Sequence, residues 1–146
     1  MTFEIRRAAA GDDREGAYLL RHQVFVLEQQ VPAELERDEH DDEADHVVAV
    51  DQAGRCLATG RLVRVDARTG KVGRMAVAAA VRGRGAGAAV LAELERIARE
   101  GRMEEIVLHA QLSAKGFYDR AGYLPEGEVF EEAGLPHVTM RKRLHP

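Results

Sequence analysis

The sequence is short of several features that would point to particular classes of protein. It has no tryptophan, one cysteine and 5% aromatic residues in 146 positions. Because a single cysteine cannot form an internal disulfide, the chain lacks the pattern of a disulfide-stabilised secreted domain. Cys56 stands in an apolar, strand-like run, so we expect it in the core and not as a nucleophile.

Neither a membrane-spanning run nor an excess of positive charge is present. No apolar stretch is long enough to cross a bilayer, and Glu4, Arg6 and Arg7 stand where a signal peptide would be apolar. The net charge is -4, whereas a general nucleic-acid binder carries a basic surface. We therefore expect a cytoplasmic protein with no membrane partner and no nucleic-acid partner.

What is present describes one ordinary globular domain. Hydrophobic residues make up 45% of the chain and charged residues 32%, as in typical globular proteins. A chain of 146 residues is long enough to build a core and has the usual length of a single domain. We expect one domain over residues 1–146, without repeats or linkers.

Apolar periodicity and turn residues predict an alternation of strands and helices. Antiparallel hairpins come first, followed by one strand–helix–strand crossover, so we expect an α+β fold. It would have a mixed, mostly antiparallel sheet of about seven strands. The predicted elements are a strand at 3–7, a helix capped by Asp12 or Asp13 and ended by Pro32, strands at 47–50, 56–65 and 71–77, a helix at 88–100, a strand at 105–111, a helix from Ser113 to Arg120, and two strands within 124–143.

The stretch Arg82-Gly83-Arg84-Gly85-Ala86-Gly87 is the most informative part of the chain. It stands between a predicted strand and a helix that opens at Ala88. Such a turn leaves backbone N–H groups unpaired at the positive end of a helix dipole, where they bind phosphate groups. Glycine lets the backbone approach closely, and arginine adds charge-assisted contacts. The loop therefore predicts a phosphorylated ligand.

Three kinds of phosphate site compete for this loop. A P-loop needs a lysine followed by a hydroxyl residue at its end, and both are missing here. A dinucleotide fingerprint fits Gly83, Gly85 and Ala88, with Glu104 about twenty residues further on. However, four strands are predicted before the loop where that fold has one, and little chain remains after it. A nicotinamide or flavin protein stays as one alternative beside an acyl-CoA site.

Two motifs in the expected order favour the acyl-CoA site. Arg82-x-x-Gly85-x-Gly87 resembles the signature of the GNAT acetyltransferases, and Ala114-x-x-Phe117-Tyr118-x-x-x-Gly122-Tyr123 resembles the last motif of that superfamily. The resemblance implies the GNAT fold, with helices on both faces of the sheet and a splayed central parallel pair of strands. Residues across nearly the whole chain further resemble the YjcF-like and ElaA-like branch, namely Arg21-x-x-Val24-Phe25-Val26-x-Glu28-Gln29-x-Val31-Pro32, His46, Ala110-Gln111 and Ala133-Gly134-Leu135-Pro136-His137.

The resemblance implies an acetyl-CoA-dependent N-acetyltransferase that acts on the primary amine of a small, unidentified acceptor. Transfer would be direct, through a tetrahedral intermediate, with acetyl-CoA as co-substrate and no metal. A non-catalytic acyl-CoA sensor on the same fold is the alternative. The sequence leaves the oligomeric state open, with a homodimer as one option.

By the same resemblance, the strand at 71–77 and the loop after it bind coenzyme A. The backbone of Met75, Ala76 and Val77 would face the pantetheine arm, with the Val77 N–H as oxyanion donor. Gln111, where the superfamily often has asparagine, would hydrogen-bond a pantetheine amide, and Phe117 belongs to the same site. The pyrophosphate would be held by the N–H groups of Arg82, Gly83, Arg84, Gly85, Ala86, Gly87 and Ala88.

The resemblance also suggests catalytic groups. Tyr118 matches the usual general acid of the family, because a phenol that titrates near about 10 is protonated at neutral pH; the alternative is a packing aromatic. Glu28 and His109 are candidates for the base, and imidazole suits this role because it titrates near neutrality. A solvent-facing strand position is the alternative for His109. His46 and His137 are weaker candidates, and water could also take the proton.

An acidic tract, residues 34–45, precedes the strand at 47–50. It is either a solvated loop or a lip over the acceptor site that attracts a cationic amine. Asp38, His40 and Asp42 lack the glycine-centred spacing of a calcium loop, so we expect no metal there.

Overall fold

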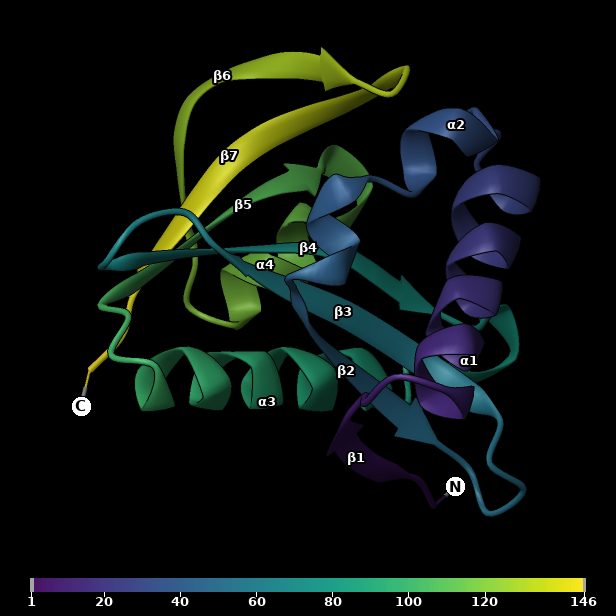
Figure 1. Cartoon of the computed structure of the whole chain (residues 1–146). Helices are drawn as coiled ribbons and strands as arrows, with labels where there is room; N and C mark the ends of the chain where they lie inside the picture. Colours follow the sequence, from purple (N-terminus) through teal and green to yellow (C-terminus); the bar gives the residue numbers. More distant parts are fainter. Residues whose placement is uncertain (1, 146) are drawn as a thin grey trace.

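The computed structural model describes residues 2–145 and contains a seven-stranded sheet with the order β1-β2-β3-β4-β5-β7-β6 (Figure 1). Only β4 and β5 pair in parallel; the other neighbours are antiparallel. The predicted α+β class and mixed sheet are therefore confirmed. The strands are β1 (Glu4–Arg7), β2 (Asp45–Val50), β3 (Cys56–Arg64), β4 (Thr69–Val77), β5 (Glu105–Gln111), β6 (Leu124–Glu132) and β7 (Leu135–Arg143). The helices are α1 (Asp12–Arg21), α2 (Ala33–Glu36), α3 (Ala86–Glu100) and α4 (Lys115–Arg120), with a π-helix η1 (His22–Glu28) and 3₁₀ turns η2 (Glu39–Asp42), η3 (Ala79–Val81) and η4 (Leu112–Ala114).

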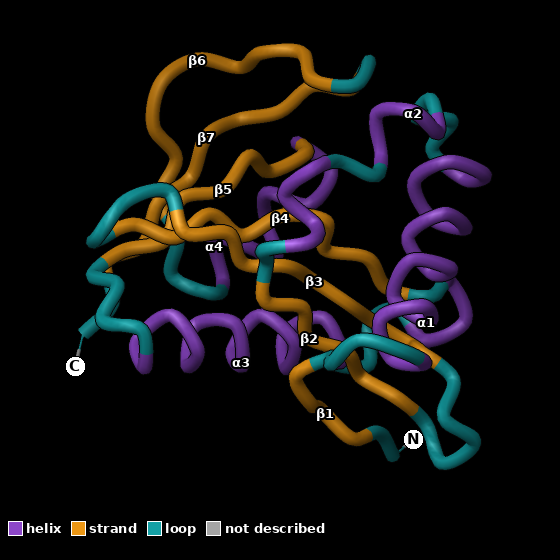
Figure 2. Tube along the Cα trace, viewed as in Figure 1, coloured by secondary structure: helices purple, strands orange, loops and turns teal. Residues whose placement is uncertain are grey.

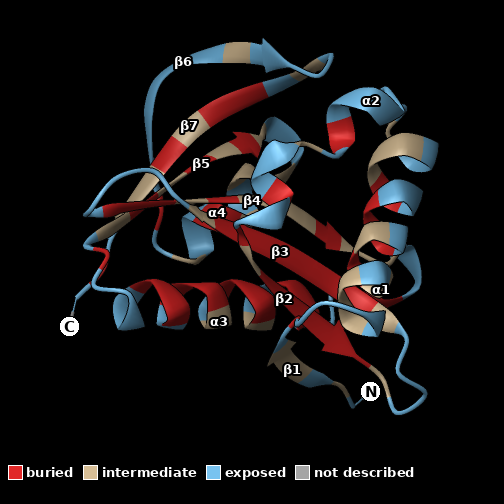
Figure 3. Cartoon of the chain, viewed as in Figure 1, coloured by how far each residue is buried: buried red, intermediate tan, exposed pale blue. Residues whose placement is uncertain are grey.

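Helices cover both faces of the sheet. Val47 of β2 packs in one hydrophobic cluster with Leu94 of α3, whereas the next residue, Val48, packs with Ala17 of α1. Because successive residues of a strand point to opposite faces, α3 and α1 lie on opposite sides of the sheet. β2 is consequently buried on both faces, while β6 at the sheet edge is largely exposed (Figure 3).

Several helix boundaries differ from the prediction. α1 begins after Gly11, and neither predicted cap serves; Asp13 instead accepts two hydrogen bonds from the Arg6 guanidinium at 2.8 Å. α1 then runs on into η1, so one helical segment changes to a wider turn before Pro32 (Figure 2). Ser113 caps nothing, because it lies inside η4. Local sequence signals placed these ends within a few residues, which is the usual limit of such signals.

The glycine loop is shorter than expected, because α3 begins at Ala86 and not at Ala88. Gly85 adopts φ 88°, a left-handed conformation that glycine takes readily, and it is the N-cap. Gly87 lies within the first turn, where a Cβ would come 3.1 Å from Cγ2 of Val77. The missing side chain therefore lets α3 pack closely on the end of β4.

The central parallel pair opens partway along its length, as the resemblance implied. β4 and β5 pair only between residues 69–72 and 105–108. Beyond Val72 and Leu108 the two strands have no common register, so residues 73–77 leave one backbone edge of β4 without a strand partner. This gap positions the candidate site.

A β-bulge in β4 marks the start of the gap. Thr59 pairs with Ala76 and Arg61 with Gly73, so Arg74 and Met75 together oppose the single residue between Thr59 and Arg61. Arg74 has φ 53°, an uncommon value for a residue with a side chain. The bulge changes the direction of the strand just before the unpaired residues.

Gly60 makes room for this bulge, and its replacement tests the arrangement. A Cβ on Gly60 would clash with Sδ of Met75 and lie 2.9 Å from Cδ1 of Leu94. We expect Gly60→Ala to lower the free energy of unfolding by about 1–3 kcal/mol, the usual cost of overpacking, as measured by urea denaturation. Gly73→Ala is the matched control, because its Cβ would meet no atom within 4 Å. Equal stability of the two variants would contradict the prediction.

Candidate active site

A cleft of about 1170 Å³ occupies the gap between β4 and β5. Its walls come from η1, α2, η2, β3, β4, β5, η4, Tyr118 of α4 and the β6–β7 hairpin. Segments distant in the sequence thus share one cavity. The predicted site residues that line it are Glu28, Met75, Ala76, Val77, Arg82, His109, Gln111 and Tyr118. The other predicted residues, Gly83 to Ala88 and Phe117, lie outside its lining, and Phe117 packs against the main core.

The N-terminus of α3 has the features of an anion site. The first helical hydrogen bond runs from the Ala89 N–H to the Gly85 carbonyl at 3.0 Å, so the N–H groups of residues 86–88 have no acceptor within the helix. Gly83 and Gly85 have φ 80° and 88°, and a Cβ on either would meet no atom within 4 Å. The turn is therefore open on its outer side, at the positive end of a 15-residue helix.

The free edge of β4 ends at Val77, which packs beside Gly87 at the start of α3. The Ala78 N–H donates to the Leu57 carbonyl at 2.8 Å, on the β3 side. Because backbone groups alternate sides along a strand, Val77 presents its N–H and carbonyl to the gap. The Val77 carbonyl accepts a hydrogen bond from Arg82 Nε at 3.1 Å. An extended ligand arm can thus hydrogen-bond this edge as an added strand would.

Glu28 and Arg82, predicted for different roles, bind each other. Both guanidinium Nη atoms donate to the Glu28 carboxylate at 2.7 Å. This hydrogen bonding lowers the pKa of Glu28 and raises the pKa of Arg82. Glu28 is therefore a weaker base than a free carboxylate as long as the pair persists. Both side chains are almost half exposed, so the pair adds little to stability.

Tyr118 points its aromatic ring into the protein while lining the cleft. It is 7% exposed, and its ring lies edge-on to Phe117 with 5.0 Å between centroids. Burial raises the pKa of the Tyr118 phenol well above its usual value, so the phenol stays protonated at neutral pH. Gln111, also in the cleft, donates from Nε2 to Oε1 of Gln29 at 2.9 Å.

The histidine candidates differ in whether they line the cleft. His46 is buried outside the cleft lining, and its Nε2 donates to the Asp41 carbonyl at 2.9 Å. Burial lowers the pKa of His46, so this residue is a neutral structural group. His109 and His137 line the cleft, and Nδ1 of His109 lies 2.9 Å from Oε1 of Glu132.

Sequence reasoning missed Glu132, which also lines the cleft. It is the last residue of β6, and the only local cue was its place beside a turn. It lies at the turn end of β6, and its carboxylate reaches His109 of β5 although β7 lies between these two strands.

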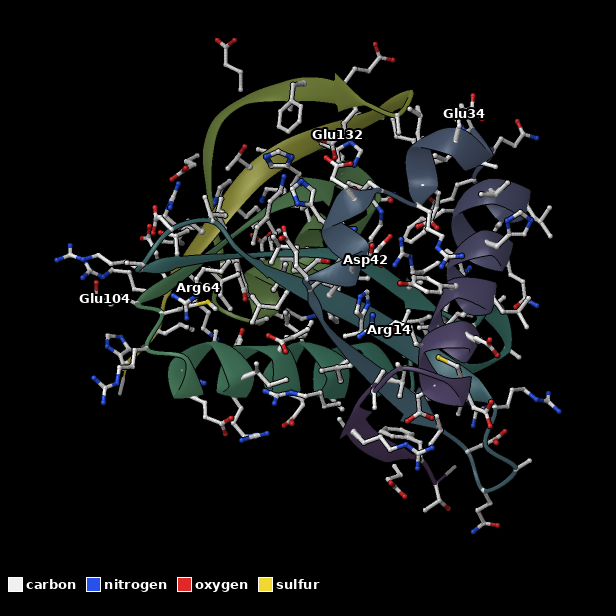
Figure 4. The ribbon with its side chains drawn as sticks, viewed as in Figure 1. Arg14, Glu34, Asp42, Arg64, Glu104 and Glu132 are labelled. Carbon is white, nitrogen blue, oxygen red and sulfur yellow. The ribbon has the colours of Figure 1, made fainter. Side chains whose placement is uncertain are left out.

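The acidic tract is neither wholly solvated nor wholly free to attract a ligand. Glu34 is exposed and points outward from α2 (Figure 4), but Glu36 and Asp41 are buried against Arg21. Asp38 pairs with Arg61 at 2.7 Å. The expectation of a solvated loop is therefore wrong for these three carboxylates. Arginines from α1 and β3 neutralise them and join the tract to the sheet.

Three further observations concern Cys56, membrane-spanning helices and metal ligands. Cys56 packs partly buried against two core clusters, and burial raises the pKa of its thiol to about 12. Within residues 2–145 there is no helix of the length and apolarity needed to cross a membrane. The same residues contain no group of three or more side chains arranged to hold a metal ion.

Fold and site define the class of protein. A model of the acetyltransferase (GNAT) domain matches residues 9–144, and the chain belongs to this family. It is 39% identical to the uncharacterized N-acetyltransferase YjcF of Bacillus subtilis over 86% of this chain and 89% of YjcF. Protein ElaA of Escherichia coli is 30% identical over 86% of this chain and 84% of its own length. The predicted resemblance is thereby confirmed.

Solved structures agree with this assignment. The crystal structure of a putative N-acetyltransferase from Lactobacillus plantarum superposes with a TM-score of 0.91 and is 31% identical. The match covers 99% of this chain and 100% of the Lactobacillus plantarum chain. The protein is therefore an acetyltransferase of the GNAT fold along its whole described length.

Proposed function

We propose that this acetyltransferase moves the acetyl group of acetyl-CoA to the primary amine of a small acceptor. Transfer is direct and passes through a tetrahedral intermediate. The observation that carries the proposal is the unpaired edge of β4 at residues 73–77, whose end at Val77 lies against the open N-terminus of α3. A thioester on a long arm with a pyrophosphate at its end suits this arrangement of an edge and an anion site.

Each part of coenzyme A has matching groups on this chain. The N–H groups at residues 82–88 and the Arg84 side chain would hold the pyrophosphate, and the edge from Met75 to Val77 would hold the pantetheine arm. Gln111 is within the same cleft and offers an amide to that arm. Three of the five N–H groups of Arg82 donate to Glu28 and to the Val77 carbonyl, which leaves two for a phosphate.

Two groups supply the chemistry of transfer. The Val77 N–H donates a hydrogen bond to the carbonyl oxygen as it gains negative charge, which is the largest kind of stabilisation in acyl transfer. Tyr118 donates its proton to the departing thiolate. Its phenol is suited to this because burial raises its pKa and keeps it protonated.

Thiol release tests the proposal. Purified protein is mixed with acetyl-CoA and a panel of monoamines, diamines, amino acids and amino sugars, and free thiol is measured against a control without amine. We expect amine-dependent thiol release and an acetylated product by mass spectrometry. Tight CoA binding without turnover on any amine would favour a non-catalytic acyl-CoA sensor. A parallel titration with NAD, expected to show no binding, separates the dinucleotide alternative.

The close packing of Gly87 on Val77 gives a second test. A Cβ added to Gly87 would lie 3.1 Å from Cγ2 of Val77. The larger side chain in Gly87→Val therefore forces the end of β4 to move relative to α3. We expect the affinity for CoA to fall at least about tenfold, which corresponds to about 1.4 kcal/mol, by isothermal titration calorimetry. Ala92→Val, at an exposed position of the same helix, is the control. Unchanged affinity in Gly87→Val would count against a CoA site at this turn.

A further inference from the structure

A carboxylate and two histidines from three strands meet on one wall of the cleft. His109 belongs to β5, Glu132 to the end of β6 and His137 to β7, and all three line the cleft. The Glu132 side chain lies beneath the β6–β7 hairpin (Figure 4). The two superfamily motifs at residues 82–87 and 114–123 include none of these residues, although His137 belongs to the pattern shared with the YjcF-like and ElaA-like branch. The cluster is thus a feature of this chain that the proposed function has not yet used.

The contact between His109 and Glu132 sets the tautomer of the imidazole. Nδ1 of His109 lies 2.9 Å from Oε1 of Glu132. Since an ionised carboxylate only accepts hydrogen bonds, Nδ1 must carry the proton. Nε2 of the neutral ring is then a free acceptor, and it forms no hydrogen bond within residues 2–145. The side chain is 28% exposed and lines the cleft, so Nε2 is accessible to a ligand.

Packing holds the His109 ring in place. Phe130 lies edge-on to it, with 5.0 Å between ring centroids and 81° between planes. His137 is the third member of the cluster, and its Nδ1 donates to the Leu135 carbonyl at 2.8 Å. Nε2 of His137 remains 3.9 Å from the second oxygen of Glu132, too far for a hydrogen bond. Glu132 is therefore bonded to His109 and only near His137.

The other charged groups around His109 are already engaged or more distant. Arg141 of β7 and Lys71 of β4 both pair with Val107, two residues before His109 on the same face. Arg141 is held by Glu105 and Glu126, at 2.7 and 3.0 Å. From η1, the carboxylate of Glu28 lines the cleft and is paired with Arg82. Glu132 is thus the carboxylate in direct contact with the imidazole.

We propose that His109 is the general base of this enzyme and that Glu132 is its positioning residue. The inference rests on the proposed function, because it requires an amine acceptor. Nε2 of His109 takes one proton from the acceptor ammonium, whose nitrogen keeps the electron pair of the broken N–H bond. The resulting imidazolium is stabilised by the Glu132 carboxylate and later gives its proton to water. After attack the nitrogen loses a second proton to solvent, and the Tyr118 phenolate takes one proton back from solvent, which replaces the proton that Tyr118 gave to the thiolate.

Three variants test the pair: His109→Gln, Glu132→Gln and the double variant. General base catalysis is worth about 10²–10⁴ in rate, so we expect His109→Gln to lower kcat at least about 100-fold with the KM for the amine changed less than about threefold. Glu132→Gln should lower kcat about tenfold or more, because the imidazolium loses the carboxylate that stabilises it and the imidazole loses the acceptor that fixes its tautomer. The double variant should be no slower than His109→Gln. Glu131→Gln, on the same strand, is the matched control and should leave all values unchanged.

A measurement that needs no turnover accompanies the kinetics. In ¹⁵N-histidine NMR at neutral pH, His109 should give the signals of the Nδ1–H tautomer in the wild type, and this signature should change in Glu132→Gln. Affinity for CoA should stay the same in every variant. Wild-type protein that releases no thiol with any amine overturns the proposed function and the base with it. If the wild type turns over but His109→Gln or Glu132→Gln keeps the wild-type kcat, the general-base proposal is overturned while the proposed function stands.

Discussion

Replacing Arg21 by methionine should lower the free energy of unfolding by about 3–5 kcal/mol, the loss typical of breaking a buried ion pair from one side. The Arg21 side chain is 1% exposed. Its Nε donates to Glu36 at 2.8 Å, and its two Nη atoms donate to Asp41 at 2.8 and 3.0 Å. Methionine fills a similar volume but leaves the buried carboxylates of Glu36 and Asp41 without this partner.

The loss in Arg21→Met should also depend on pH. Burial raises the pKa of Asp41, but hydrogen bonds and charge from Arg21 and Arg61 outweigh it, and the net pKa lies well below the usual value. A depressed carboxyl pKa contributes stability above the pKa of the unfolded state, about 3.9 for aspartate, and that contribution is lost as pH falls through the folded value. The difference between wild type and variant should therefore be largest near pH 7 and shrink below about pH 4.

Urea denaturation of both proteins at pH 7 and near pH 3.5 checks this prediction. Arg55→Met is the control, because Arg55 is exposed in the β2–β3 turn, and it should change stability by less than about 0.5 kcal/mol. A loss below about 1 kcal/mol in Arg21→Met at pH 7 would mean that the network contributes no more than a surface pair. The network joins α1 to η2 and β3, so its loss should also disturb the wall of the cleft that Glu36, Asp38 and Arg61 line.

Tyr118→Phe should lower kcat by about 10²–10⁴, the range that a positioned general acid contributes. The change removes one hydroxyl from a residue that is 7% exposed and leaves its packing against Phe117 in place. Affinity for CoA should therefore stay within about twofold. Because burial raises the pKa of Tyr118, ionisation of this phenol should not produce a basic limb in the wild-type pH profile near neutrality.

Tyr123→Phe is a matched control for Tyr118→Phe, because it makes the same chemical change five residues away. The Tyr123 hydroxyl donates to Glu95 at 2.9 Å, and the residue is 1% exposed and does not line the cleft. We expect Tyr123→Phe to cost about 1–3 kcal/mol of stability, since it leaves Oε2 of Glu95 without its donor, while kcat is unchanged. Steady-state kinetics with the best amine of the panel decide between the two residues. A fall of less than about threefold in Tyr118→Phe would remove this residue from the acid role.

Much of the fold could be predicted because its signals are local. The apolar run Ile106-Val107-Leu108 predicted a strand at 105–111, and β5 has the same bounds. The predicted helix at 88–100 ends at the expected residue, where Gly101 is the C-cap of α3. The prediction for the glycine loop also used local information alone, namely a predicted strand, closely spaced glycines and a predicted helix in that order.

The contacts within the site could not be predicted in the same way. Glu28 meets Arg82 across 54 positions, and His109 meets Glu132 across 23. Such pairs depend on which strands are neighbours and on their register, and no local pattern carries that information. The burial of Glu36 and Asp41 was missed for a related reason, because the arginines that neutralise them come from α1 and β3.

The sequence by itself determined the class of fold, the family and the position of the glycine turn before α3, because periodicity, glycine spacing and two motifs act over short stretches of chain. Only the tertiary structure decided which acidic and basic groups are free to react. It paired Glu28 with Arg82, left Nε2 of His109 open to the cleft and enclosed Tyr118 so that it keeps its proton. The physical reason is that protonation and availability depend on burial and on the nearest charge, and both are set by residues far away in the chain.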